Sequence, residues 1–358
     1  MIRLYIVSII ALFCSACSAP QIATERYVWP PPPDIARIEW LKSYSSQLDL
    51  EKSSYQRFWT AVAGDDAPRT LLKPVEVKSV PELDKFLVSD IGRSAVVVFD
   101  RAGYEVRTLR IPDGSPPLLM PMSIALDRDG YIYVLERRSA TVRVFDASEK
   151  YQRTIPLKPV SVRTPTSMII DKKKGQIYIS DAATRKIVIT DLQGQFVRGI
   201  GGTTDTDVQF NLPIAMALNS KGHLIVADAF GANIQVFDQN GRFMNKFGRR
   251  GDSAGDFQLI KSIAVDSSDN IYVVDGRASN ITILNERGEL LLVLGGYYVS
   301  ATTGKIAPGG FAIPIGIDID STDKIYVVDQ MNTRVQVFQY FSEEYLRRNP
   351  PDTQEHLK

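Results

Sequence analysis

The sequence is poor in the residues that build most metal and redox sites. It contains two cysteines, Cys14 and Cys17, and two histidines, His223 and His356. A structural zinc site needs four ligands, so the C-x-x-C pair would supply only half of one. A redox C-x-x-C is expected at the start of a helix beside a βαβ pattern, and this pair instead follows an apolar run. A metal site and a redox dithiol are therefore the weaker interpretations of the pair.

The sequence also lacks an excess of charge of either sign. Lysine and arginine total 42 residues and aspartate and glutamate 41, for a net charge of +1. A neutral protein has no overall field to attract phosphate backbones, so we expect no nucleic-acid partner, although a local basic patch stays possible. With 44% hydrophobic and 23% charged residues, the composition is that of a globular protein with a core.

Long apolar runs are missing except at the start, where residues 4–13 are apolar and follow Arg3. A spanning helix needs about 20 apolar residues. A short basic start, an apolar stretch and small residues describe a secretory signal. Ser15, Ala16 and Cys17 resemble the lipobox of bacterial lipoproteins. The resemblance implies a signal peptide over residues 1–16, lipidation of Cys17, and a periplasm-facing protein held in the envelope, with Ser18 permitting export to the outer membrane. An uncleaved anchor is the alternative.

A proline-rich segment follows, and we expect residues 17–36 to form a tether. Four consecutive prolines at residues 30–33 predict a stiff polyproline II spacer between the membrane and the folded body. The alternative is a ligand for a proline-binding domain.

The remainder is dominated by an internal repeat. Six segments each show two apolar, β-branched runs around a short polar turn, which is a hairpin pattern. The acidic residue that ends the first run recurs every 45 to 47 residues, except for a last step of 54, at Asp90, Glu136, Asp181, Asp228, Asp275 and Asp329. Another short strand precedes most hairpins and a fourth follows several. Four strands in about 45 residues, six times over, predict a β-propeller.

These segments resemble NHL repeats, best in "SIAVDSSDNIYVVDG" from Ser262 and "IYVVDQMNTRVQVF" from Ile325. The resemblance implies an all-β, six-bladed propeller of four-stranded blades over residues 71–341. NHL propellers serve as binding platforms, as sensors and in a few cases as enzymes, so the fold leaves the function open. An arginine five residues after the acid survives only as Arg334, and we interpret it as structural.

The flanking segments predict how the ring closes. The last repeat lacks a clear fourth strand, and "ARIEWLKSYS" alternates Ile38 and Trp40 with polar residues. We expect it to supply the outer strand of the sixth blade, since open sheet edges invite aggregation. Within residues 37–70 an apolar i, i+3, i+4, i+7 pattern at residues 55–62 predicts a short helix, packed on the body or docking a partner. Residues 342–358 read as a polar tail.

Carboxylates are the main side chains in the expected channel that could form a catalytic or metal-binding site. Repeated acids at the ends of the inner strands, Asp127, Asp171, Asp266 and Asp320, indicate turn chemistry. Glu76, Lys78 and Asp318 break the repeat, because other blades have small or apolar residues at these positions. Blades one and six are neighbours, so we expect a structural ion pair between Lys78 and Asp318. The alternatives are a metal or ligand site that includes Glu76, and no contact at all.

The loop between the fifth and sixth blades carries the extra residues of the 54-residue step. Tyr297 and Tyr298 lie on it, and Arg249 and Arg250 lie on the preceding inter-blade loop. Aromatic residues and arginine are enriched at interfaces, so these four are candidate partner-binding residues. The alternative is an ordinary loop whose tyrosines fold back on the body.

From sequence we therefore expect a lipid-anchored, non-catalytic platform that binds a protein, or a peptide or glycan, and holds no cofactor and no metal. The alternative is a divalent-metal-dependent hydrolase or lyase with carboxylate ligands in the channel. Lyase propellers of the amidating and streptogramin types resemble this repeat but use histidines, of which this chain has two.

Overall fold

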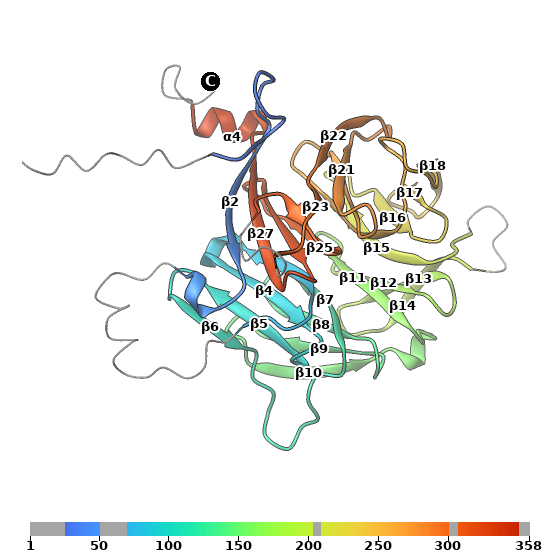
Figure 1. The fold of residues 1–358 in the computed structure, drawn as a ribbon. Helices are drawn as coiled ribbons and strands as arrows, with labels where there is room; N and C mark the ends of the chain where they lie inside the picture. Colours follow the sequence, from blue (N-terminus) through green and yellow to red (C-terminus); the bar gives the residue numbers. More distant parts are fainter. Residues whose placement is uncertain (1–25, 51–69, 203–208, 301–306, 351–358) are drawn as a thin grey trace, which may run out of the picture.

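The apolar runs and polar turns of the repeat form antiparallel sheets around a central channel (Figure 1). The computed structural model describes residues 26–50, 70–202, 209–300 and 307–350. The inner strand of each sheet packs against the inner strand of the next, and that of the last sheet packs against that of the first. The predicted six-bladed β-propeller of four-stranded blades is confirmed.

In the first five blades the strands follow one another from the channel to the outer wall. The first blade contains β3 (Pro74–Val80), β4 (Lys85–Asp90), β5 (Ala95–Asp100) and β6 (Glu105–Thr108). The second contains β7 (Pro121–Leu126), β8 (Ile132–Glu136), β9 (Thr141–Phe145) and β10 (Tyr151–Pro156). The third contains β11 (Pro165–Asp171), β12 (Gln176–Asp181), β13 (Lys186–Asp191) and β14 (Phe196–Gly201).

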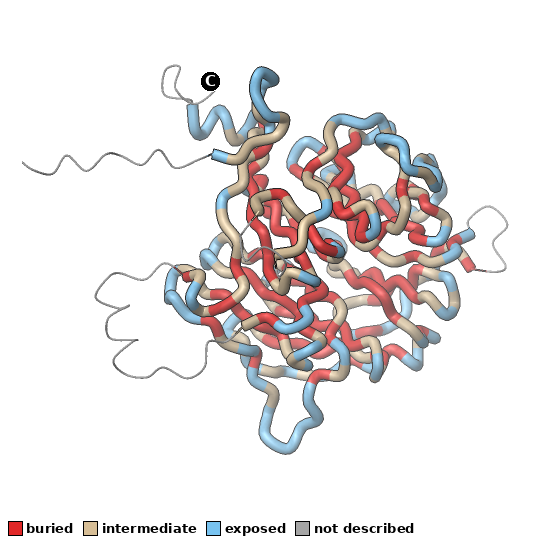
Figure 2. The backbone as a smooth tube through the Cα atoms, viewed as in Figure 1, coloured by how far each residue is buried: buried red, intermediate tan, exposed pale blue. Residues whose placement is uncertain are grey.

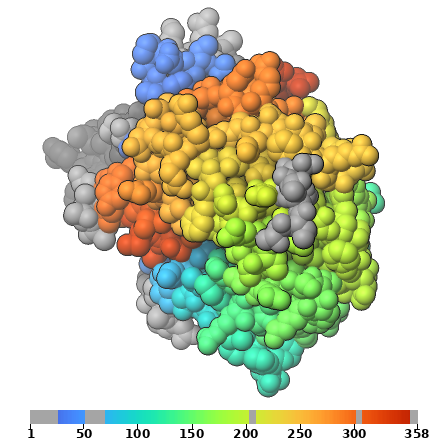
Figure 3. Space-filling view, turned by 90° about the vertical axis from the view of Figure 1, so that its right-hand side faces the viewer, coloured from blue at the N-terminus to red at the C-terminus, as the bar shows by residue number. Residues whose placement is uncertain are grey.

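The next two blades follow the same plan, and the third to fifth blades succeed one another from green to orange in Figure 3. The fourth contains β15 (Pro213–Leu218), β16 (Leu224–Asp228), β17 (Asn233–Phe237) and β18 (Phe243–Phe247). The fifth contains β19 (Ile260–Val265), β20 (Ile271–Asp275), β21 (Asn280–Leu284) and β22 (Leu290–Leu294). Two short strands, β23 (Gly296–Tyr297) and β24 (Gly310–Phe311), pair in parallel within the loop that leads to the sixth blade.

The sixth blade combines both ends of the chain. Its inner three strands are β25 (Pro314–Ile319), β26 (Lys324–Asp329) and β27 (Arg334–Tyr340). The predicted closing strand is confirmed, because β2 (Ile38–Tyr44) pairs antiparallel with β27, with Ile38 opposite Tyr340. Ile38 is fully buried there, so an apolar side chain of the N-terminal segment completes the core of the last blade.

The proline run does not form the straight spacer that the sequence predicts. The two-residue strand β1 (Val28–Trp29) pairs with β2, and the amide of Arg37 donates to the carbonyl of Trp29 at 2.7 Å. Residues 30–33 therefore lie in the turn of a hairpin attached to the sixth blade. The ring of Trp29 packs edge-on against Phe338 with centroids 5.8 Å apart, and this contact holds the hairpin on the blade.

The core lies between the blades. Consecutive residues of the two middle strands of the blades are mostly buried (Figure 2). The described residues form six apolar clusters, and each combines side chains of two adjacent blades. Each blade thus buries its two faces against its neighbours, which is how a propeller hides sheets that no helix covers.

The described residues contain few helical segments. They are the 3-10 turns η1 (Gln47–Asp49), η2 (Pro81–Leu83) and η3 (Lys158–Val160) and the helix α4 (Glu343–Arg348) at the start of the predicted polar tail. The helix expected over residues 55–62 lies outside the described residues, as do residues 1–25 with Cys14 and Cys17. In the part of the chain that the structure describes, no helix has the length and apolarity needed to cross a membrane.

Candidate functional site

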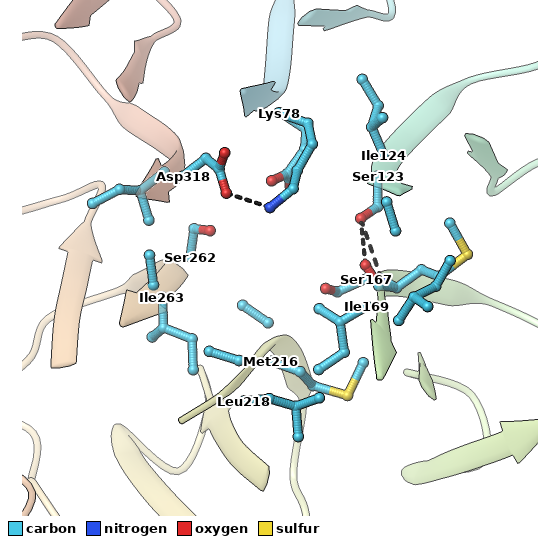
Figure 4. A pocket seen from close by; sticks show the side chains of 18 of the residues that line it. Lys78, Ser123, Ile124, Ser167, Ile169, Met216, Leu218, Ser262, Ile263 and Asp318 are labelled. Atoms are coloured by element: carbon cyan, nitrogen blue, oxygen red, sulfur yellow. Dashed lines mark hydrogen bonds and ion pairs between the residues drawn. The ribbon is translucent and has the colours of Figure 1, made fainter. Parts of the chain in front are cut away.

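The inner strands enclose a channel cavity of about 240 Å³ (Figure 4). One side of it carries Lys78 and Asp318, with Ser123, Ser167 and Ser262 nearby. The other side is apolar and is formed by residues such as Ile169 and Leu218. The channel therefore carries an ion pair where the first and sixth blades meet and the ring closes, and Lys172, which follows β11 of the third blade, adds a further cation to its lining.

The two charged residues that break the repeat are brought together. The ammonium of Lys78 lies 2.5 Å from Oδ1 of Asp318. The other carboxylate oxygen, Oδ2, accepts hydrogen bonds from the amide and the hydroxyl of Ser79 at 2.8 and 2.5 Å. Burial lowers the pKa of Lys78, but the charge and hydrogen bond of Asp318 outweigh it, so that the pKa is raised. Lys78 therefore keeps its charge at neutral pH, and both oxygens of Asp318 find donors within the ring.

Glu76 lies two residues before Lys78 on β3, therefore on the same face of the strand, and it lines the cavity. Among the described residues its carboxyl group has no hydrogen-bonding or ion-pairing partner. Burial first, and then the charge of Asp318, raise the pKa of Glu76 to about 8, although Lys78 opposes the shift. Its equivalents in the other blades are small: Ser123, Ser167, Ala215, Ser262 and Gly316. Glu76 is thus a neutral acid at pH 7, facing the channel.

This arrangement is a poor cation site. The ammonium of Lys78 occupies one oxygen of Asp318, and Ser79 occupies the other. Within the described ranges no group of three or more Asp, Glu, His or Cys side chains is placed to hold a metal ion. The repeated acids at the strand ends are also engaged. Oδ1 of Asp266, for example, accepts from the amides of Ser268 and Asn270 at 2.9 Å, and this confirms the predicted turn chemistry.

The acid that ends the second strand of each blade has a different role. Oδ1 of Asp275 accepts from the amide of Arg277, in the turn that follows, and Oδ2 from the amide of Gln258, in the preceding inter-blade loop. Asp90 and Asp228 make the same two kinds of contact. These acids therefore fix two kinds of segment at one end of the ring, the loops between blades and the turns between the second and third strands of each blade. We call this end the inter-blade face.

The four candidate partner-binding residues lie on loops of this face. Tyr297 is 76% exposed although it belongs to the β23–β24 pair. Tyr298 is half-buried, and its backbone is anchored on both sides, by Phe311 and by Asn332. The first tyrosine therefore points to solvent, and the second is part of its support.

The two arginines occupy the loop between the fourth and fifth blades. Nε of Arg249 lies 2.9 Å from Oδ1 of Asp256, while 78% of the Arg249 side chain stays exposed. The guanidinium of Arg250 donates to the carbonyl of Gln258 at 3.1 Å and to that of Phe230 at 3.2 Å. Arg249 is thus held through Nε and Arg250 through its terminal nitrogens, and both residues remain exposed.

Sequence reasoning missed apolar residues beside these four. Phe230 is 64% exposed on the β16–β17 turn, and Met331 is 60% exposed on the β26–β27 turn. The amide of Met331 donates to the carbonyl of Ala312, which joins this turn to the loop that carries Tyr297. The signal was available in the repeat, because most other blades have glycine, alanine or arginine at the same turn position.

A second residue missed from sequence is Arg143. Its Nε donates to Oε2 of Glu136 at 3.0 Å, and both side chains are buried. Arg334 makes the corresponding contact with Asp329 at 2.8 Å and reaches the carbonyl of Gly310 at 2.7 Å, as its structural interpretation predicts. In the second blade the arginine comes two positions further along the strand and contacts the longer glutamate.

Blade number, strand order and the channel define the class: the chain is a six-bladed β-propeller. In agreement, the family model DUF5128, described as "6-bladed beta-propeller", matches residues 203–284. No curated protein is significantly similar to the chain.

Solved propellers share the fold at low identity. A protein of unknown function from Bacteroides thetaiotaomicron superposes with a TM-score of 0.60 and 12% identity, over 85% of this chain and 75% of that one. Virginiamycin B lyase from Staphylococcus aureus gives a TM-score of 0.55 and 13% identity, over 75% and 94% of the two chains. A streptogramin B lyase gives 0.52 and 11%, over 75% and 93%. Such identities establish the fold and leave the activity open.

Proposed function

We propose that the protein is a non-catalytic binding platform that engages a protein partner through its inter-blade face. The observation that carries the proposal is Tyr297, whose ring is 76% exposed on a loop fixed by strand pairing. Because the backbone of this loop is already fixed, binding through Tyr297 would order little further backbone, and tyrosine is frequent among residues that dominate interface energies. Phe230 and Met331 extend the same exposed face.

The channel gives less support to the alternative, a metal-dependent hydrolase or lyase. The carboxylate of Asp318 is fully engaged by Lys78 and Ser79. His223 is the one histidine in the described part of the chain. It does not line the channel cavity, nor the neighbouring cavity that is lined by Lys78, Pro81 and Asp127. Residues for a histidine-dependent lyase reaction are therefore not gathered in the described channel.

We further propose that the platform is lipid-anchored at Cys17 in a bacterial envelope, facing the periplasm. The support is the apolar run and lipobox-like sequence at the N-terminus. The folded body begins nearby, since β1 starts eleven residues after that cysteine, at Val28. Replacing Cys17 by serine should abolish lipid modification, seen as a loss of the acyl mass and of detergent-phase partitioning.

The partner should be found by co-purification from detergent-solubilised envelopes, with mass spectrometry and metal analysis of the same sample. We expect a stoichiometric protein partner that is lost in a Tyr297→Ala, Arg249→Ala, Arg250→Ala variant. Phe196→Ala is the matched control, because Phe196 is equally an exposed aromatic residue, at 60%, but lies on the outer strand β14. A tightly bound divalent ion without a partner would overturn the proposal and favour the channel enzyme.

A further inference from the structure

The exposed charges on the described loops and turns of the inter-blade face are mainly positive, although the whole chain has a net charge of only +1. The exposed arginines on its described turns and inter-blade loops include Arg138, Arg163, Arg185, Arg249, Arg250 and Arg277. In the described loops of this face the exposed acidic residues are Asp113 and Asp252. The described part of this face is therefore mainly positive, and its field extends about 8 Å at physiological ionic strength.

The acids beneath this surface do not present negative charge to a partner. Asp181 and Asp275, for example, are buried, and their oxygens accept hydrogen bonds from loop amides. The amide of Arg163 is one donor to Asp181, and that of Arg277 is one donor to Asp275. The same contacts that bury the carboxylates thus fix the backbone of the arginines and leave their side chains in solvent.

Exposed apolar side chains lie on the same face as the arginines. Arg250 donates to the backbone of Phe230, so that an exposed cation and an exposed aromatic residue occupy adjacent turns of two blades. Tyr297 and Met331 continue the apolar part toward the sixth blade. Arginine, aromatic residues and methionine are the types enriched at protein interfaces, whereas a purely polyanionic ligand would not use apolar side chains that are 60 to 76% exposed.

We propose that the partner of the inter-blade face is an acidic protein segment that carries aromatic or aliphatic side chains among its carboxylates. This inference rests on the proposed platform function and names the chemistry of its partner. The arginines would guide approach and pair with carboxylates, because a planar guanidinium can bind a carboxylate through two hydrogen bonds. Phe230, Met331 and Tyr297 would bury apolar surface between those pairs.

The test compares two triple variants of the full chain that remove the same charge. One changes Arg163, Arg250 and Arg277 to glutamine on the inter-blade face. The other changes Lys150, Lys173 and Arg242, which are exposed on turns of the opposite face, to glutamine. The probe is an immobilised glutamate–tyrosine copolymer. A lysine–tyrosine copolymer, phosphatidylglycerol vesicles and alginate are tested beside it, as a basic polypeptide, an anionic membrane and an anionic polysaccharide. Unchanged circular dichroism of both variants controls for folding.

We expect the inter-blade variant to weaken binding of the glutamate–tyrosine copolymer at least about tenfold, and the opposite-face variant less than about twofold, with the affinity falling as salt rises. A Phe230→Ser, Met331→Ser variant should weaken binding again. Equal losses in both triple variants, or no binding of the copolymer, would refute the proposal. Binding of vesicles or alginate with the same dependence on the arginines would replace the protein by another anionic partner.

The experiments distinguish a wrong acidic partner from a wrong platform function. If a co-purified partner is lost in the Tyr297→Ala, Arg249→Ala, Arg250→Ala variant but kept in the triple glutamine variant, the platform stands and the acidic partner does not. If neither variant loses a partner, the face itself is excluded as the binding surface.

Discussion

The carboxyl group of Glu76, which has no hydrogen-bonding or ion-pairing partner among the described residues, makes a sharp prediction about stability and pH. Burial and the charge of Asp318 raise the folded-state pKa of Glu76 to about 8, from the ordinary 4.5. A group whose pKa is higher in the folded state favours folding while it is protonated. Its contribution is therefore complete below pH 4.5 and is lost as the pH rises through 8. The variant Glu76→Gln keeps the shape and removes the titration.

The size of the effect follows from the same two pKa values. At 1.36 kcal/mol for each pKa unit, the interval sets an upper bound of about 4 to 5 kcal/mol. Because Glu76 is only partly buried and faces a channel, we expect about 2 to 3 kcal/mol after screening by channel water. Above pH 8 the glutamine variant should be the more stable protein by this amount, and near pH 4.5 the two should be alike.

Urea denaturation between pH 4.5 and 9 measures this difference directly. The control is Ser262→Ala, which removes a channel hydroxyl at the equivalent position of the fifth blade and introduces no titrating group, so it should keep the wild-type dependence on pH. Parallel stability curves of wild type and Glu76→Gln across the whole range would refute the reasoning, since the carboxyl group would then be solvated as in the unfolded chain.

Three further changes should act on stability, each measured by urea denaturation. Lys78→Met should cost about 3 kcal/mol by leaving the Asp318 carboxylate unpaired, and Lys78→Met combined with Asp318→Leu should recover most of the loss; an unrecovered loss would contradict the pairing. Arg334→Ala should cost about 3 kcal/mol by stranding buried Asp329, and a loss below about 0.5 kcal/mol would contradict this. Ile38→Ala should cost about 2 to 4 kcal/mol through the cavity left in the closing strand, and a neutral result would mean that β2 does not complete the core.

The scaffold was predictable because the repeat expresses it six times. Each blade needs two faces of buried β-branched residues and a turn acid, and these leave the same pattern in every segment. Departures from the pattern were equally informative in the channel, where Lys78 and Asp318 stood out against alanine and isoleucine in the other blades. The structure then placed the two within 2.5 Å of each other.

Features that depend on how segments meet in space were not predictable. The proline run was interpreted as a straight spacer, because the pairing of β1 with β2 rests on two residues, Val28 and Trp29, too few to form a pattern. Arg143 was missed since its position relative to Glu136 follows from side-chain length and not from the repeat. Phe230 departs from the glycine, alanine or arginine of other blades at this turn position, but its exposure depends on the direction of the turn, which no sequence pattern gives.

The channel charges are best explained by closure of the ring. Lys78 belongs to the first blade and Asp318 to the sixth, so their pair crosses the seam between the two ends of the propeller. The seam is also tight in its backbone, since a Cβ at Gly316 would lie 2.6 Å from the carbonyl of Val75.

The outer wall of the same seam is closed by the chain's N-terminal strand. There β2 pairs with β27, and the ring of Tyr44 packs edge-on against Phe86 of the first blade with centroids 5.2 Å apart. The ion pair on the channel side and the added strand on the outside thus both stabilise the contact between the first and sixth blades. A charge pair used in this way is not free to act on a substrate, and this is why the accessible arginines and apolar side chains of the inter-blade face are the better candidates for function.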